Sequence, residues 1–208
     1  MTGSRLRRAG QHLAAPVVRS RAAVARWLHP ASALIIPTLE AGPAVAGWTG
    51  RRRIDFDGAP LHVTVMYPFL PAPQLDGQVE DQVRDIAAGT PGFSFSLAHV
   101  DQFPGVYYLA PSPADPFVTL TELVQEHWPQ CQPYGGMFDQ ITPHVTVAFG
   151  ETPPADPALL QQRLPIACVA TELWLIEQKA AGWRTRKRFP LRATASTQSD
   201  EADQIRRR

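Results

Sequence analysis

The chain has 208 residues, 44% of them hydrophobic, and its 20 basic and 19 acidic side chains give a formal net charge of +1. This length accommodates one core or two small lobes, and no apolar run approaches the roughly 18 residues that a membrane-spanning helix needs. Residues 31–192 hold 11 basic and 16 acidic side chains, a net charge of −5. A negatively charged body disfavours tight, sequence-independent binding of long nucleic acid, which requires phosphate neutralisation.

The two ends of the chain differ in composition from the middle. Residues 1–30 contain six arginines and no acid, without the apolar stretch of a secretory signal. They fit a transit peptide or a flexible basic arm, and we favour the arm. Residues 193–208 are polar and are predicted to be a disordered tail. Cys131 and Cys168 show no metal-binding spacing, so we expect buried free thiols in a reducing compartment and a cytoplasmic protein.

Between these ends, short apolar segments alternate with segments of helical periodicity. We expect strands over 33–37, 61–69, 93–97, 105–110, 143–149, 169–178 and 184–191, the last two joined by a hairpin turn at 179–183. We expect helices over 43–52, 76–88, 114–128 and 157–164. The mixture of hairpins and helical crossovers is typical of an α+β fold and not of a doubly wound parallel sheet.

The tetrapeptide His-Val-Thr-Val occurs twice, beginning at His62 and at His144. Successive side chains of a strand point to opposite faces, so in each copy the His and the Thr share one face and the two valines share the other. A valine face suits a core. The other face supplies a proton-transfer group and a hydroxyl donor. We therefore predict that His62, Thr64, His144 and Thr146 surround one small anion.

The surroundings of the two motifs also repeat. Each motif strand is followed by a helix and then by two strands, and the two copies lie 82 residues apart. This predicts a domain over 31–192 that is a diverged internal duplication, with lobes of approximately 31–111 and 112–192. In this pseudo-twofold, bilobal fold, two antiparallel sheets form a central cleft between the motif strands, with the helices on the outside.

Paired histidines suit acid–base chemistry on a bound anion. The ordinary pKa of His lies near 6.5, so one neutral and one protonated imidazole coexist near neutrality and serve as base and acid. Thr64 and Thr146 would donate hydrogen bonds to oxygens of this anion that gain negative charge during the reaction. The sequence leaves open which histidine is the acid and which is the base.

Further side chains are candidates to bind substrate. The aromatic candidates for stacking on a base or closing the cleft are Tyr67, Phe103, Tyr107 and Tyr134. Packing in the core is the alternative for each. Arg184, Arg186 and Arg188 alternate along a predicted strand and would share one face as a basic wall, or else form a solvated edge strand.

Two HxT motifs about 80 residues apart in an α+β chain of this length resemble the two-histidine (2H) phosphoesterase superfamily, which includes 2′-5′ RNA ligase-like proteins and 2′,3′-cyclic nucleotide phosphodiesterases. The stretches 61–69, 103–111 and 133–139 are similar to its bacterial 2′-5′ RNA ligase-like branch. The resemblance covers roughly residues 32–192. It implies a V-shaped cleft and chemistry without metal or cofactor on 2′,3′-cyclic phosphates or 2′-5′ linkages of RNA ends or small nucleotides, with 2′-5′ ligation as the reverse reaction.

Other interpretations remain open from the residues alone. A non-catalytic module would use the same cleft to bind RNA ends or nucleotides. A metal site built on His62 and His144 lacks an obvious third ligand, since Thr binds zinc poorly. A purely structural protein is the last alternative. We expect a monomer with no membrane partner.

Overall fold

The computed structural model describes residues 32–49, 58–138 and 140–194, so the predicted N-terminal arm and nearly all of the predicted tail lie outside the described residues. The strands of this part are β1 (Ser32–Pro37), β2 (His62–Met66), β3 (Phe93–Phe103), β4 (Val106–Ser112), β5 (Val145–Phe149), β6 (Ile166–Ala170), β7 (Glu172–Lys179) and β8 (Gly182–Pro190). The α-helices are α2 (Gly42–Thr49), α3 (Gly77–Gly89), α4 (Asp115–His127) and α5 (Pro157–Gln161). Short 3₁₀ turns are η2 (Leu39–Ala41), η3 (Ala72–Gln74) and η4 (Pro133–Gly136).

Local sequence explains where the helices begin and which side they bury. The Asp76 carboxylate accepts a hydrogen bond from the Val79 backbone N–H at 2.9 Å and caps α3. Asp156 caps α5 in the same way, through the Ala158 N–H. Helix α4 buries Phe117, Leu120 and Val124 on one side, as its periodicity predicts. These caps and apolar faces place the helices against the sheet.

The described strands form a single antiparallel sheet in the order β6-β3-β4-β5-β2-β1-β7-β8. The α+β class is therefore confirmed, whereas the predicted pair of sheets is not. Val63 of β2 pairs with Val145 of β5, and this pairing joins the half β6-β3-β4-β5 to the half β2-β1-β7-β8. Neither half is one continuous segment of the chain, because β7 and β8 return to pair beside β1.

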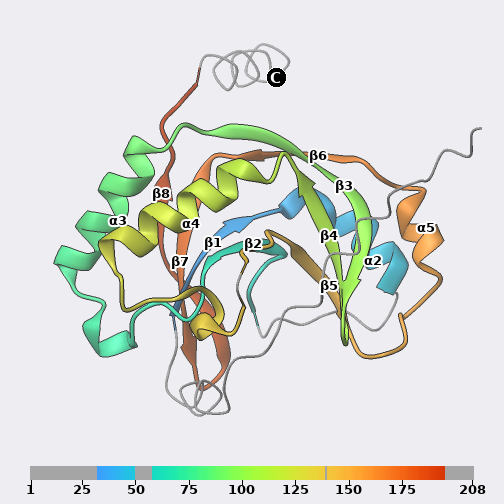
Figure 1. Ribbon diagram of the computed structural model, residues 1–208, viewed down its shortest axis with the longest axis horizontal. Coiled ribbons are helices and arrows are strands. Elements are labelled where there is room, and N and C mark those ends of the chain that lie inside the picture. The colour runs from blue at the N-terminus through green and yellow to red at the C-terminus, as the bar shows by residue number, and fades with distance from the viewer. Residues whose placement is uncertain (1–31, 50–57, 139, 195–208) are drawn as a thin grey trace, which may run out of the picture.

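The sheet is strongly curled (Figure 1). Strands β6 and β7 stand near opposite ends of the strand order, yet Thr171 alone separates them in the sequence. The same closure brings Pro91 beside Arg192, where the Gly92 N–H donates to the Arg192 carbonyl at 2.8 Å. The prediction of one strand over 169–178 was wrong at its start: residues 169 and 170 are the end of β6, and the range from Glu172 onwards belongs to β7.

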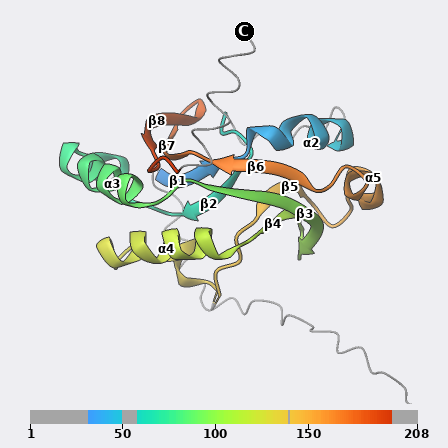
Figure 2. The ribbon, with the colours of Figure 1, turned by 90° about the horizontal axis from the view of Figure 1, so that it is seen from above.

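One face of the sheet and the helices enclose the main core. Val63, Val65, Val145 and Val147 all lie in it, at most 2% exposed. Helices α3 and α4 lie beside the half that contains β8 and β2, and α2 and α5 lie beside the half that contains β3 (Figure 2). The two cysteines are buried and unpaired. No helix in the described ranges is long and apolar enough to cross a membrane.

Candidate active site

The two motifs lie side by side at the centre of the sheet. Because Val63 pairs with Val145 in an antiparallel register, the next residues along place His62 opposite Thr146 and Thr64 opposite His144. Residues opposite each other on neighbouring strands have Cβ atoms about 5 Å apart. The four motif side chains therefore form the corners of a small quadrilateral on one face, with each histidine beside the threonine of the other motif.

Backbone carbonyls orient both imidazoles in the same way. His62 Nδ1 lies 2.6 Å from the Pro60 carbonyl oxygen, and His144 Nδ1 lies 2.7 Å from the Thr142 carbonyl oxygen. Since a carbonyl oxygen can only accept, Nδ1 carries the hydrogen in each ring. The exchangeable proton is consequently gained and lost at Nε2 in both histidines.

The surroundings lower the pKa of both histidines. For His62, burial is the main cause of the lower pKa, the Pro60 carbonyl opposes it, and the charge of His144 lowers it further. For His144, burial again lowers the pKa and the Thr142 carbonyl opposes it. Each imidazole is thus shifted towards its neutral form, and the two rings interact electrostatically.

Three aromatic rings surround His144. The rings of Phe103 and Tyr108 stack with centroids 4.3 Å apart, and they approach the His144 ring at 5.2 and 5.4 Å. Tyr134 of η4 lies nearly parallel to the His144 ring at 6.1 Å. The structure therefore brings Phe103 and Tyr134, two of the predicted substrate-binding residues, to the motif face.

Tyr108 was missed in the sequence, and its neighbour Tyr107 lies elsewhere. Tyr108 is opposite Thr146, whereas Tyr107 is buried in the main core and contacts Trp48 at 6.3 Å between ring centroids. Adjacent residues of a strand point to opposite faces, so only one of the two tyrosines can face the site. Which of the two faces the site depends on how β4 pairs with β5, a long-range contact that alternation along β4 alone does not give.

Tyr67 belongs to a second, smaller apolar cluster on the motif face. This cluster consists of Ala33, Ile35, Trp174 and Ile176, with Ala59, Tyr67 and Trp183 packed against it. Ile35 pairs with Thr64 on one side and with Trp174 on the other, so the cluster lies directly beside the first motif. The Tyr67 ring meets the Trp183 ring edge to face at 5.9 Å.

The predicted wall of three arginines does not form on one face. Thr185 pairs with Ile176 and Lys187 with Leu175, so Arg186 is an extra residue that forms a bulge in β8. Arg186 binds Glu80 of α3 at 2.8 Å, and Arg184 lies opposite Glu177. Both therefore lie on the α3 side of the sheet, away from the motif histidines.

Arg188, in contrast, shares the motif face. It pairs with Trp174, which pairs with Ile35, which pairs with Thr64. Its guanidinium carbon lies 4.0 Å from the centroid of the Trp174 ring, a cation–π contact. Of the three alternating arginines, this is the one that the register places in a cross-strand row with the first motif.

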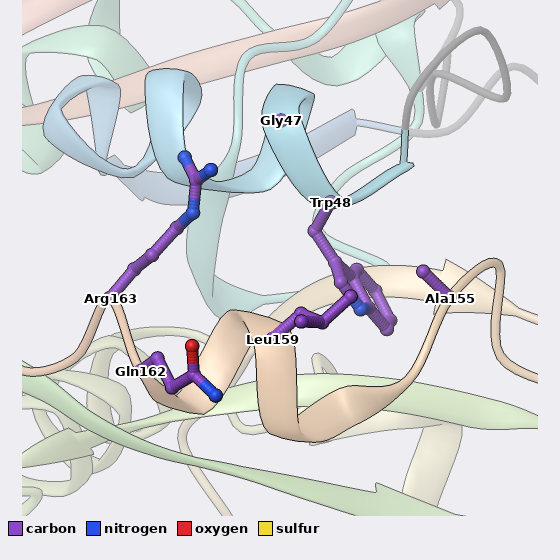
Figure 3. Close-up of a pocket in the computed structure, with 6 residues that line it drawn as sticks. All are labelled: Gly47, Trp48, Ala155, Leu159, Gln162 and Arg163. Carbon is purple, nitrogen blue, oxygen red and sulfur yellow. The ribbon is translucent and has the colours of Figure 1, made fainter.

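A pocket of about 320 Å³ opens between α2 and α5, lined by Gly47, Trp48, Ala155, Leu159, Gln162 and Arg163 (Figure 3). It contains none of the motif residues, and its Trp48 belongs to the core that backs the valine face. This pocket is therefore separate from the candidate active site. In the described ranges, no group of three His, Cys, Asp or Glu side chains is arranged to hold a metal ion.

Several solved structures share this fold. A structure described as a phosphoesterase matches with a TM-score of 0.53 at 19% identity, covering 78% of this chain and 99% of that chain. E. coli LigT in complex with 3′-AMP matches with a TM-score of 0.52 at 20% identity, again over 78% and 99%. The protein TT0787 of Thermus thermophilus gives a TM-score of 0.54 at 16% identity, over 78% and 98%. At these identities the likeness concerns the fold.

A comparison of the amino-acid sequence with known protein families shows which family the chain belongs to. No curated protein matches the chain. A family model described as the 2′-5′ RNA ligase superfamily, however, matches residues 37–182, well over half of the chain, and this range contains β2, β5 and both motifs. The chain therefore belongs to the 2′-5′ RNA ligase superfamily.

Proposed function

We propose that this protein is a metal-independent phosphodiesterase in which His62 and His144 act as the acid–base pair. Its proposed substrates are 2′,3′-cyclic phosphates or 2′-5′ phosphodiesters of RNA ends or small nucleotides. The observation that supports this most strongly is the placement of the two HxT motifs on adjacent strands, with the same Nδ1–carbonyl contact in each. Binding a phosphate requires donors alone, whereas two imidazoles with matched tautomers suit proton transfer in both directions.

Hydrolysis of a cyclic phosphate needs one proton removed and one supplied. The neutral histidine takes a proton from water at Nε2 while the water oxygen bonds to phosphorus. The bond from phosphorus to one ribose oxygen then breaks, and the protonated histidine gives its Nε2 proton to that oxygen. The two histidines exchange protonation states in the reaction, and each returns to its starting state by proton exchange with solvent. Ligation would follow the same steps with the 5′ hydroxyl of a second RNA end in place of water: the neutral histidine takes the proton of this hydroxyl, its oxygen bonds to phosphorus, and the protonated histidine gives its proton to the ribose oxygen that leaves. Cleavage of the resulting 2′-5′ linkage to the cyclic phosphate is the reverse of these steps.

The threonines would stabilise charge on the phosphate. In the transition state, negative charge builds up on the two oxygens that are not bonded to carbon, and preorganised hydroxyl donors stabilise it. Thr64 and Thr146 lie beside opposite histidines. A phosphate held between them is therefore approached by one imidazole from each side.

Relatives with nucleotides bound support a small substrate. E. coli LigT has been crystallised with 3′-AMP and with NADP⁺. We propose that the face of this protein that carries the motifs likewise accepts a nucleotide, with Phe103, Tyr108 and Tyr134 beside His144 as the surface for its base or sugar.

The test is hydrolysis of 2′,3′-cyclic AMP in the presence of a chelator by the wild type, His62→Ala and His144→Ala. Each substitution should lower kcat by about 10³-fold, within the range of general acid–base contributions. The matched control is His127→Ala, at the exposed end of α4, which should leave kcat unchanged. Activity lost in chelator would instead indicate a metal site. Binding of 3′-AMP without turnover of any 2′,3′-cyclic or 2′-5′ substrate would indicate a non-catalytic binding module.

A further inference from the structure

Tyr134 has an unusual backbone conformation beside the motifs. Its φ is 51° and its ψ is 32°, and within the described ranges it is the one non-glycine residue with a positive φ. This left-handed conformation is unfavourable for a residue with a Cβ and persists where surrounding contacts enforce it, often at functional sites. The two residues that follow, Gly135 and Gly136, also have positive φ angles.

Contacts of its backbone and ring fix the position of Tyr134. Its N–H donates to the Tyr67 carbonyl at 2.6 Å, which ties η4 to the segment that leaves β2. Its ring lies at 21° to the His144 ring with centroids 6.1 Å apart, and the Phe138 ring meets it edge to face at 5.6 Å. The strained backbone thus places the ring over the second motif.

The phenol reaches the first motif. Thr64 follows Val63 and His144 precedes Val145 in the paired strands, so Thr64 lies beside His144, next to the ring that Tyr134 stacks on. Burial raises the pKa of Tyr134 to about 12, and a side-chain hydrogen bond with Thr64 opposes this rise. Tyr134 therefore keeps its proton at neutral pH and contacts one residue of each motif.

We propose that Tyr134 is a positioning residue that donates its hydroxyl hydrogen to Thr64 Oγ1 and thereby directs the Thr64 hydrogen towards the substrate phosphate. This inference rests on the proposed phosphodiesterase function. The direction of the chain follows from charge: an anionic phosphate oxygen is the stronger acceptor and takes the one hydrogen of Thr64. Thr64 Oγ1 must then accept from Tyr134, and successive hydrogen bonds in such a chain strengthen each other.

The two threonines are not equivalent in this respect. Thr146 is opposite Tyr108 on one side, but Asp101 of β3 is opposite Tyr108 on the other, and burial followed by this carboxylate raises the pKa of Tyr108 to about 12. Tyr134 should therefore act through Thr64 and not through Thr146. This difference distinguishes a specific positioning role from a general contribution of the aromatic ring to the fold.

The test is a pair of double-mutant cycles measured as kcat/KM on 2′,3′-cyclic AMP. Removing a direct oxyanion donor costs about 10²-fold or more, so we expect about 10²-fold for Thr64→Ala and about tenfold for Tyr134→Phe, which keeps the ring. If Tyr134 acts through Thr64, the double variant Tyr134→Phe/Thr64→Ala should be no worse than Thr64→Ala alone. In the Thr146→Ala background, Tyr134→Phe should still cost its full tenfold.

Further measurements separate this role from a loss of folding. The tenfold loss should appear in kcat with little change in KM, and the pH profile should keep its position, because neither histidine is altered. Thermal unfolding of each variant checks the fold. Additive losses in the Thr64→Ala background, to about 10³-fold in total, would overturn the inference while leaving the proposed function intact.

If the wild type is inactive, the proposed function is wrong, and this result alone does not test the inference about Tyr134. The same cycles would then be measured as affinity for 3′-AMP by calorimetry. Tyr134→Phe should weaken that binding when Thr64 is present and have no effect in the Thr64→Ala background. An equal loss in both backgrounds, or no loss in either, would overturn the inference.

Discussion

His62 and His144 each donate Nδ1–H to the carbonyl of the residue two positions earlier. The strand backbone that holds each ring therefore also selects its tautomer. Burial lowers the pKa of both rings, and the carbonyl contact limits how far it falls. These opposing influences, burial and the carbonyl two residues before each motif, determine the pH range in which one ring is neutral while the other is charged.

The pH dependence of activity follows from these shifts. The ordinary pKa of His is 6.5, and both histidines lie below it, so kcat/KM should follow a bell-shaped curve with its maximum on the acid side of pH 6.5. Activity falls at higher pH because the acid loses its proton, and at lower pH because the base gains one. Initial rates at low substrate concentration between pH 4.5 and 8.5 measure this curve, and a maximum above pH 7 would contradict the prediction.

Stability should depend on pH for the same reason. A histidine with a lowered pKa takes up its proton more readily in the unfolded chain than in the folded protein. Each neutral histidine therefore makes its full contribution to the free energy of unfolding above pH 6.5. This contribution is lost as the pH falls towards the lowered pKa of the folded protein. The free energy of unfolding, measured in urea, should be lower at pH 5.5 than at pH 7.5. His62→Gln and His144→Gln should each make this difference smaller. An unchanged drop in both variants would contradict this prediction.

Strand β8 is attached to helix α3 by charged side chains. Glu80 accepts hydrogen bonds from Lys187 at 2.7 Å and from Arg186 at 2.8 Å. The Lys187 contact, followed by the Arg186 contact, holds the pKa of Glu80 below its ordinary value. Because the bulge turns Arg186 away from the motif face, the Arg186 side chain helps to attach β8 to α3.

Glu80→Gln should therefore lower stability without lowering activity. The three side chains are partly solvent-screened, so we expect a loss of about 1 kcal/mol at pH 7. This contribution is present above the ordinary pKa of 4.5 and disappears as the pH falls below it, because a lowered carboxyl pKa favours the folded state only when the group is ionised. Urea unfolding at pH 7 and pH 3.5 measures it.

The matched control for that experiment is Asp81→Asn on the same helix. Asp81 pairs with Arg84, but their side chains are 64% and 47% exposed. An exposed pair of this kind contributes little, so stability should change by less than about 0.5 kcal/mol. Equal losses for Glu80→Gln and Asp81→Asn would show that the β8–α3 attachment has no special role.

At the scale of the whole molecule, the site depends on the junction of the two halves of the sheet. Val63 and Val145 pair there, both fully buried, and each is adjacent to a motif histidine. Substituting Val145 by Ala should cost about 2 kcal/mol of stability through lost burial and incomplete repacking. It should also lower kcat by about tenfold, because small displacements of reacting groups are costly.

Val83→Ala is the control for the junction. Val83 is also fully buried, but it lies in α3, away from the motif strands. Its loss of stability should match that of Val145→Ala, while kcat measured well below the unfolding temperature should stay at the wild-type value. Similar effects of the two substitutions on kcat would contradict a special role for the junction.

Much of the site was determined by the sequence itself. Alternation along a strand is a local property of the backbone, so the two His-Val-Thr-Val copies were enough to place His and Thr on one face and the valines on the other. The periodicity of α3 and α4 and the cap at Asp76 were equally local. Each depends on residues a few positions apart, whose relation the covalent chain fixes.

The tertiary structure decided what depends on strand pairing. The pairing of β4 with β5 put Tyr108 opposite Thr146 on the motif face, and a bulge in β8 moved Arg186 to Glu80, since a bulge forms only in relation to a partner strand. The strand predicted over 169–178 contains the end of β6, which pairs with β3, and most of β7, which pairs with β1, and only these long-range pairings divide it at Thr171. The single sheet in place of two likewise depends on the contact of Val63 with Val145, residues that only long-range folding brings together.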